Sequence, residues 1–180
     1  MFRRHYAIIP ALFVMLAVMS LTACVDKMPG ASEADTELAK DGIYTSPPEL
    51  VVTVGSSSVT ARRGGFSWSC NIDGHETAIE ADSLHPLDES CRELTPVING
   101  TDIYERVNLD FQLPPDEITV GSWSAEYWGN IGAEYEVVEV DGFSFGLNTG
   151  EHIYYITAVW DNDGGRYHGS STYSVVISSE

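Results

Sequence analysis

The chain has 180 residues and a formal net charge of −18, with 27 acidic residues against 9 lysines and arginines. This length fits one domain with an added segment and excludes a kinase, a large α/β barrel or a multi-domain machine. The acidity argues against nucleic acid or an anionic lipid surface as a partner, whereas 43% hydrophobic and 11% aromatic residues exclude a wholly disordered chain.

The first 23 residues have the form of a signal peptide. Two arginines precede an uncharged run over residues 6–23, a pattern typical of export signals. The run ends in Leu21-Thr22-Ala23-Cys24, which resembles the lipobox of bacterial lipoproteins. The resemblance implies cleavage after Ala23 and lipidation of the Cys24 thiol. An uncleaved transmembrane helix and plain secretion are the alternatives.

Residues 24–46 are predicted to be the lipidated N-terminus followed by a flexible acidic spacer. The segment is poor in aromatic residues and rich in Ala, Ser, Glu and Asp, so it cannot bury enough apolar area to offset its ordering entropy. A short helix over residues 33–40 would be marginal in isolation. We therefore expect a folded domain at residues 47–180, tethered to the outer face of the cell membrane.

The domain begins with short β-rich runs, LVVTV at residues 50–54 and FSWSC at residues 66–70, separated by glycines. The clearest strand spans residues 103–113, where five of six odd positions are apolar and the even positions are polar or amphipathic. Residues 153–160 are apolar on both faces apart from Thr157, which predicts a central strand. Residues 167–177 alternate again.

The apolar parity changes near Gly121-Ser122, where Ile118 and Val120 are followed by Trp123, and a β-bulge is the simplest explanation. The one candidate for a 3.6-residue period, residues 76–83, lies in a loop. Seven to nine short strands with Gly/Pro turns predict an all-β fold, an antiparallel immunoglobulin-like β-sandwich.

Two cysteines, Cys70 and Cys91, remain once Cys24 is assigned to lipid. An even pair in an extracytoplasmic chain predicts a disulfide. It would close a loop of about twenty residues and stabilise the domain by roughly 3 kcal/mol in the chain-entropy model. The alternatives are two free thiols or a separation that a disulfide cannot bridge.

The stretch from Pro47 to Trp68 reads PPELVVTVG and then SVTARRGGFSW. With DSLHPL at residues 82–87, VNLDF at residues 107–111 and the closing strand, it resembles small lipoproteins of Gram-positive bacteria. The resemblance covers most of the mature domain, and its motifs are structural: turns, core aromatics and edges. It implies no catalytic residue and no cofactor.

One motif in the domain suggests catalysis. Gly142-Phe143-Ser144-Phe145-Gly146 matches the nucleophile-elbow pattern, and Asp161 and His168 follow in the order of a hydrolase triad. No helix pattern follows the motif, however, and no parallel sheet is expected. We therefore expect Ser144 on a strand, opposite an aromatic pair, and no catalytic residues.

Two further patterns suggest metals. Asp161-x-Asp163-Gly164 resembles part of a calcium loop but lacks the remaining ligands. His75 and His85 lie near acidic residues, in a spacing that fits no closed zinc site. We expect no metal.

Trp123, Tyr127 and Trp128 are the candidate binding aromatics. Most aromatics of a small domain belong to its core, but exposed ones can stack on a sugar or a partner peptide. The sequence therefore favours a membrane-anchored extracytoplasmic lipoprotein whose non-enzymatic domain binds an envelope protein, a peptide or a glycan. An accessory or sensory subunit of an envelope membrane complex is the alternative, and a small hydrolase is less favoured.

Overall fold

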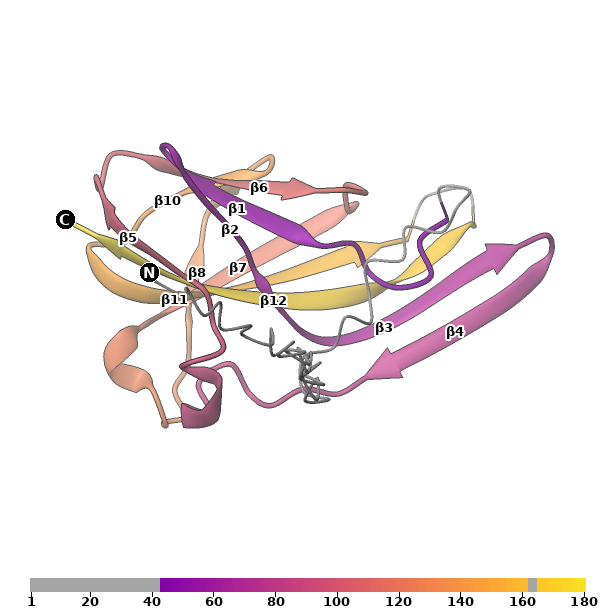
Figure 1. Cartoon of the computed structure of the whole chain (residues 1–180), viewed down its shortest axis with the longest axis horizontal. Coiled ribbons are helices and arrows are strands. Elements are labelled where there is room, and N and C mark those ends of the chain that lie inside the picture. The colour runs from indigo at the N-terminus through magenta and orange to yellow at the C-terminus, as the bar shows by residue number, and fades with distance from the viewer. Residues whose placement is uncertain (1–42, 162–164) are drawn as a thin grey trace, which may run out of the picture. The chain divides into compact units, whose positions relative to one another are not determined.

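The computed structural model describes residues 43–161 and 165–180 (Figure 1). Two β-sheets face each other across a shared apolar core. Within the described ranges, the helical segments are two short 3₁₀ turns, η1 (Glu89–Cys91) and η2 (Ala125–Tyr127). The predicted all-β sandwich is confirmed.

Each sheet combines strands from both halves of the domain. The smaller sheet contains β1 (Leu50–Val54), β2 (Ser57–Thr60), β6 (Arg106–Phe111), β9 (Val140–Asp141) and β10 (Ser144–Gly146). The larger sheet contains β3 (Arg62–Ile72), β4 (His75–Ala81), β5 (Val97–Thr101), β7 (Glu117–Ser124), β8 (Glu136–Val138), β11 (Gly150–Trp160) and β12 (Tyr167–Ser179).

The strand orders are β2-β1-β6-β10-β9 in the smaller sheet and β4-β3-β12-β11-β7-β8 in the larger one. All of these pairings are antiparallel, whereas β5 pairs with the last part of β12 in parallel. The long strand β12 therefore has β11 along one edge, and β3 followed by β5 along the other. β11 and β12 lie at the centre of the larger sheet.

Period-two alternation explains the smaller sheet. Every second residue of β1 and of β6 is buried, and Val52 pairs with Leu109 in register. The predicted strand at residues 103–113 is shorter in the structure, because the backbone N–H groups of Tyr104 and Glu105 donate to the side chain and carbonyl of Asp102 and close a turn. Local hydrogen bonds thus keep residues 103–105 out of the strand, although the apolar alternation includes them.

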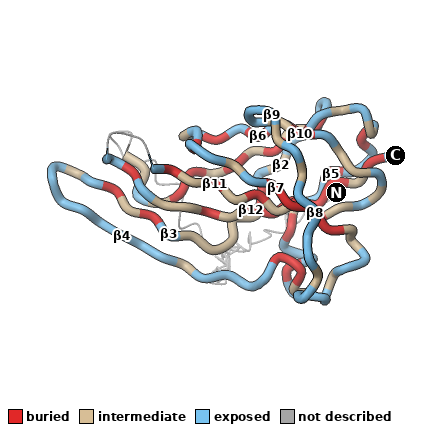
Figure 2. Tube along the Cα trace, turned by 180° about the vertical axis from the view of Figure 1, so that it is seen from behind, coloured by how far each residue is buried: buried red, intermediate tan, exposed pale blue. Residues whose placement is uncertain are grey.

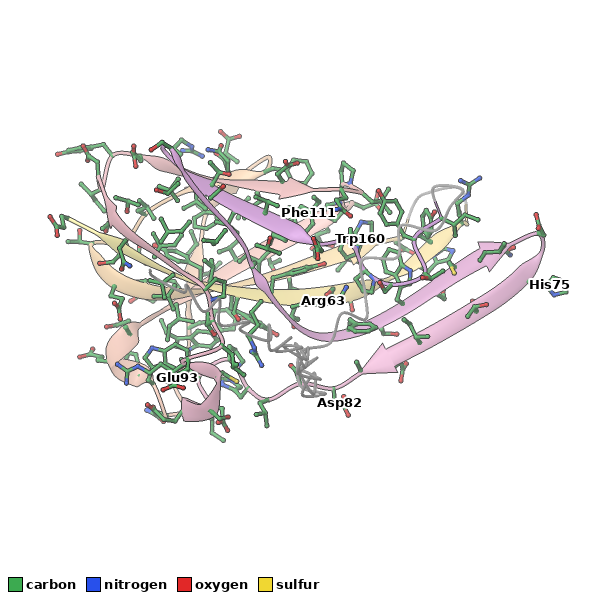
Figure 3. All side chains as sticks on the ribbon, in the orientation of Figure 1. Arg63, His75, Asp82, Glu93, Phe111 and Trp160 are labelled. Atoms are coloured by element: carbon green, nitrogen blue, oxygen red, sulfur yellow. The ribbon has the colours of Figure 1, made fainter. Side chains whose placement is uncertain are left out.

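Aromatic rings join the two sheets. Phe111 of the smaller sheet and Trp160 of the larger one meet between the layers, with ring centroids 6.0 Å apart (Figure 3). Trp160 also contacts Trp68 edge to face at 5.2 Å, and Phe111 contacts Tyr173 at 5.7 Å. Such pairs add about 0.5–1.5 kcal/mol each beyond the area they bury.

The expected β-bulge near Gly121-Ser122 is wrong. β7 pairs with β11 without a register shift, from Glu117 opposite Val159 to Ser124 opposite His152. The apolar parity changes because β7 is buried on both faces: Val120 packs in the sandwich core, whereas Trp123 packs in a second cluster on the outer face. The pairing irregularity lies instead between β12 and β3.

The predicted disulfide is also wrong: Cys70 and Cys91 are both free and buried. Cys70 lies in β3, opposite Thr77 in the β3–β4 hairpin. From Thr77 the chain runs back along β4 to Ala81, opposite Phe66, before it continues to Cys91 in η1. The hairpin thus carries the two thiols away from each other. Burial raises the pKa of the Cys70 thiol, which favours its unreactive protonated form.

The β3–β4 hairpin extends beyond the sandwich (Figure 1). Its outer strand β4 is exposed along almost its whole length (Figure 2), and His75 lies at its tip (Figure 3). Charged side chains on β4, Glu76 and Glu80, oppose edge-to-edge association with another strand.

The domain's contacts begin within the segment predicted as the spacer. Ile43 and Tyr44 pack against the core, and the indole Nε1 of Trp68 donates to the Tyr44 carbonyl at 3.0 Å. The backbone N–H of Tyr44 donates to the Tyr167 hydroxyl at 3.1 Å. The predicted spacer up to residue 42, the leader and Cys24 lie outside the described residues. Among the residues that are described, no helix is long and apolar enough to cross a membrane.

The stability of the domain should decrease at alkaline pH because of Tyr173. Its hydroxyl donates to the Pro48 carbonyl at 2.6 Å in a buried setting, and burial raises the pKa of Tyr173 to about 12 from an ordinary 10.0. The unfolded chain loses this proton first, so the contribution is complete below pH 10 and is lost as pH rises toward 12. A shift of this size corresponds to about 2–3 kcal/mol.

Urea unfolding of the wild type and of Tyr173→Phe at a series of pH values from 9 to 12 measures the contribution of the Tyr173 hydroxyl to the free energy of unfolding. The difference in unfolding free energy between the two proteins should shrink as pH rises. Tyr154 has a pKa that burial also raises, but it is present in both proteins and cancels. A difference that stays constant across the range would contradict the prediction.

Candidate functional site: an aromatic pocket on the outer face of the larger sheet

A second apolar cluster covers part of the outer face of the larger sheet. Trp123 of β7, Ile153 of β11 and Val176 of β12 are buried there together with Leu87. The three strand residues are neighbours across the sheet, since Ile153 pairs with both Trp123 and Val176. Leu87 comes from the segment between β4 and η1, which therefore closes over this face of the sheet.

Beside this cluster is a cavity of about 460 Å³, within the range of about 300–1,000 Å³ typical of small-molecule sites. We call it the aromatic pocket. It is lined by His85, Pro86, Trp123, Ala133, Glu134, Tyr135 and Tyr155. The lining residues come from four separate segments of the chain, which only the folded structure brings together.

Trp123 is the central ring of the aromatic pocket. It is 4% exposed, and its indole Nε1 donates to the Ala133 carbonyl at 3.0 Å. Tyr135 lies 5.5 Å away at an interplanar angle of 88°, and Tyr155 lies 5.8 Å away at 49°. The rings thus form the walls of a corner, not one flat platform.

Gly121 determines where the Tyr135 ring lies. A Cβ atom at Gly121 would come 2.7 Å from Cγ of Tyr135, because the ring covers the bare backbone of β7 at this position. Gly121 also pairs directly with Tyr155 on β11. The missing side chain in the middle of a strand therefore leaves room for the Tyr135 ring next to Trp123.

His85 forms a further wall of the pocket. Its ring lies 5.7 Å from Trp123 at 63°, and its Nδ1 accepts the Leu87 N–H at 3.2 Å. The turn continues at Asp88, whose carboxylate accepts the Ser90 hydroxyl at 2.6 Å and the Ser90 N–H at 3.0 Å. These bonds, the side-chain one foremost, lower the pKa of Asp88. Local hydrogen bonds thus hold the segment that carries His85.

The structure divides the three predicted binding aromatics. Trp123 lines the aromatic pocket. Trp128 is partly buried against the outer cluster, and Tyr127 is 39% exposed; neither lines the pocket. The sequence prediction missed Tyr135 and Tyr155, and the glycine opposite Tyr155 in the middle of a strand is the one local signal that points to them.

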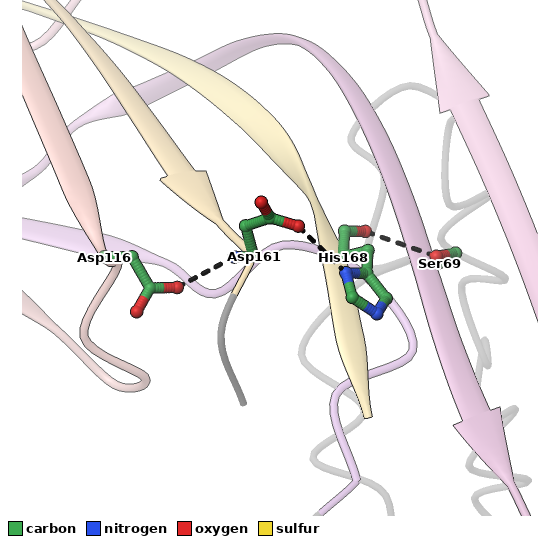
Figure 4. A network of polar contacts seen from close by, with 4 residues as sticks. All are labelled: Ser69, Asp116, Asp161 and His168. Carbon is green, nitrogen blue, oxygen red and sulfur yellow. Dashed lines mark hydrogen bonds and ion pairs between the residues drawn. The ribbon is translucent and has the colours of Figure 1, made fainter. Parts of the chain in front are cut away.

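The residues of the hydrolase hypothesis are brought together only in part. Asp161 Oδ1 lies 3.2 Å from His168 Nδ1 at the exposed ends of β11 and β12 (Figure 4). Asp116 accepts the Asp161 N–H at 2.7 Å, and the Ser69 hydroxyl donates to the His168 carbonyl at 3.4 Å. The hydroxyl of Ser69 therefore faces the backbone of His168 and not its ring.

Ser144 lies in the other sheet. It pairs with Asn108 in β10 and β6, and its hydroxyl accepts the Arg106 Nε–H at 2.8 Å. The nucleophile-elbow motif therefore forms a turn and the short strand β10, which lies between β6 and β9 in the smaller sheet. Beside it is a polar cavity of about 650 Å³ that Arg106 and carboxylates of β8 and β9 line. The Ser144 hydroxyl bonds Arg106, whereas Asp161 and His168 lie at strand ends of the larger sheet.

The candidate ligands of the two predicted metal patterns do not form a metal site among the described residues. Residues 43–161 and 165–180 contain no group of three or more His, Cys, Asp or Glu placed to hold a metal ion. His75 lies at the hairpin tip (Figure 3), whereas His85 lies in the aromatic pocket. Asp163 and Gly164, the remaining part of the calcium pattern, lie outside the described residues.

The aromatic pocket combines apolar rings with a few polar groups, which is the composition of small-ligand sites. The polar cavity beside Ser144 lacks such rings. Comparison with known proteins adds no further constraint: no family model matches the sequence, and no match was found among curated proteins or solved structures.

Proposed function

We propose that this protein is a membrane-anchored extracytoplasmic lipoprotein whose β-sandwich binds a ligand in the aromatic pocket and catalyses no reaction. The observation that carries the binding role is the corner of rings around Trp123, each of which the fold positions before any ligand arrives. Preorganised walls lower the entropic cost of binding. The sequence pattern around Cys24 supports the anchor.

The position of the pocket is consistent with ligand capture. The chain enters the domain at Tyr44, whose ring contacts Tyr167 at the end of the sandwich that also holds Trp160. Tyr155 of the pocket lies five residues before Trp160 on β11, or about 17 Å at 3.3 Å per residue. The pocket therefore lies about this far from the end of the sandwich where the described chain begins.

Site-specific photo-crosslinking in intact cells tests the binding role. A photoreactive phenylalanine analogue replaces Tyr135, which is 51% exposed at the pocket, or Tyr104, which is 90% exposed in the turn before β6. We expect a defined adduct from position 135, identified by mass spectrometry, and none from position 104. Equal labelling at both positions, or none at position 135, would contradict the proposal.

A further inference from the structure

The arrangement of rings in the aromatic pocket favours a compact cation. Tyr135, Tyr155 and Trp123 meet at 88° and 49°, so a group placed in the corner contacts π-systems from more than one direction. Aromatic faces attract cations at distances up to about 6 Å from the ring centroid. A sugar ring, in contrast, stacks best on one flat aromatic platform, which this corner does not offer.

The charges around the pocket select the same class of ligand. Glu134 lines the pocket, and none of the arginines in the described part of the chain does. The protein as a whole carries −18, which raises the local concentration of cations and repels anions. An acidic ligand would have to overcome both effects.

The largely apolar walls of the pocket distinguish among cations. A primary ammonium group brings three N–H donors that need acceptors when water is removed, and the Ala133 carbonyl in the lining already accepts from Trp123. A trimethylammonium group has no N–H and presents methyl groups to the rings. Its charge is then balanced by the π-faces and by Glu134.

Resting on the proposed binding function, we infer that the aromatic pocket recognises a small, soluble compound with a trimethylammonium group. Such a group is compact enough to enter the corner, and the remainder of the molecule extends toward solvent past Tyr135. We assign the ligand to the soluble pool and not to lipid headgroups, because a chain with a net charge of −18 is repelled by an anionic membrane surface.

Titration of the full-length protein with three matched compounds tests the inference. Choline carries charge and methyl groups, 3,3-dimethylbutan-1-ol has the same shape without charge, and ethanolamine has the charge without the methyl groups. The protein is purified in an uncharged maltoside detergent, labelled with 5-fluorotryptophan, and observed by ¹⁹F NMR at constant ionic strength. The chain has 4 tryptophans, whose signals are assigned by Trp→Phe substitution.

Choline should shift the Trp123 signal saturably, and both analogues should bind at least about fivefold more weakly, which corresponds to a cation–π contribution of about 1 kcal/mol. Glu134→Gln should weaken choline binding about fivefold, because two unit charges about 4 Å apart in water interact by about 1 kcal/mol. Glu126→Gln, which removes an equal charge from exposed η2 outside the pocket, is the matched control and should change nothing. Tyr135→Ala should weaken choline binding more than Glu134→Gln does. Unchanged signals from Trp68 and Trp160 in this variant show that its core is intact.

Equal affinity for choline and the neutral alcohol would overturn the cationic ligand, and equal affinity for ethanolamine would overturn the methylated one. Binding to phosphatidylcholine vesicles without a response to choline would overturn the soluble source. Absence of any shift would also overturn the inference. If position 135 still gives its crosslinked adduct in cells, the failure concerns only the ligand class, whereas loss of both signals removes the binding function as well.

Discussion

Replacing Gly169 with alanine is expected to lower the free energy of unfolding by about 3 kcal/mol or more, the range of severe backbone clashes in a core. Gly169 lies on β12 between Trp68 of β3 and Trp160 of β11. A Cβ atom there would come 2.9 Å from the Cα of Trp68. The atoms it meets are backbone atoms of a paired strand, which cannot move aside without breaking the sheet.

The backbone conformation adds to this cost. Gly169 has a φ of +153°, which residues with a side chain rarely adopt. Urea unfolding followed by tryptophan fluorescence measures the loss. The matched control is Gly146→Ala in β10, where a Cβ atom would meet nothing within 4 Å and the expected change is within about 0.5 kcal/mol. Equal effects of the two substitutions would contradict this account of β12.

Replacing Cys24 with serine is expected to move the protein from the membrane fraction to the soluble fraction or to leave it as an unprocessed precursor. Each buried methylene of an acyl chain contributes about 0.8 kcal/mol, and stable anchoring takes more than one chain. In the proposed anchor the thiol carries the diacylglyceryl group, and a serine hydroxyl cannot replace it. The strong acidity of the chain gives it no electrostatic affinity for an anionic surface.

Fractionation of cells that express each variant, together with the mass of the protein, measures this effect. Cys70→Ala is the control, because Cys70 is buried in the core and its removal should leave the protein with the membranes. If Cys24→Ser remains in the membrane fraction at the wild-type size, the apolar run at residues 6–23 is itself the anchor.

The sequence predicted those elements whose burial follows from local periodicity. The alternation over residues 106–111 and the apolar face of residues 167–177 appear in the structure as β6 and as the inward face of β12. The run at residues 153–160 is the central strand β11, with β7 and β12 on its two sides. A strand has a fixed period of two, so its buried face can be read from one segment alone.

Periodicity failed where a second layer covers the outer face of the sheet. The sequence predicted a bulge before Trp123, because no local signal shows that Leu87 and Trp128 pack over that face. The predicted disulfide failed for a related reason. It rested on an even number of cysteines in an exported chain, and this argument takes no account of the β3–β4 hairpin, whose direction separates the two thiols. Both errors concern contacts between segments that are far apart in the chain, and the local sequence pattern does not show which of these segments come together.

The sequence by itself determined the fold class and the acidic character, and it predicts an exported, lipidated N-terminus, since each of these inferences depends on composition or on residues close in the chain. Only the tertiary structure decided the site. The sequence analysis named Trp123 as a candidate binding residue, but the pocket also needs Tyr135, Tyr155 and His85, which belong to other segments. They meet because Gly121 leaves room on β7 and because the segment before η1 folds over the sheet, and such non-local packing has no periodic signature.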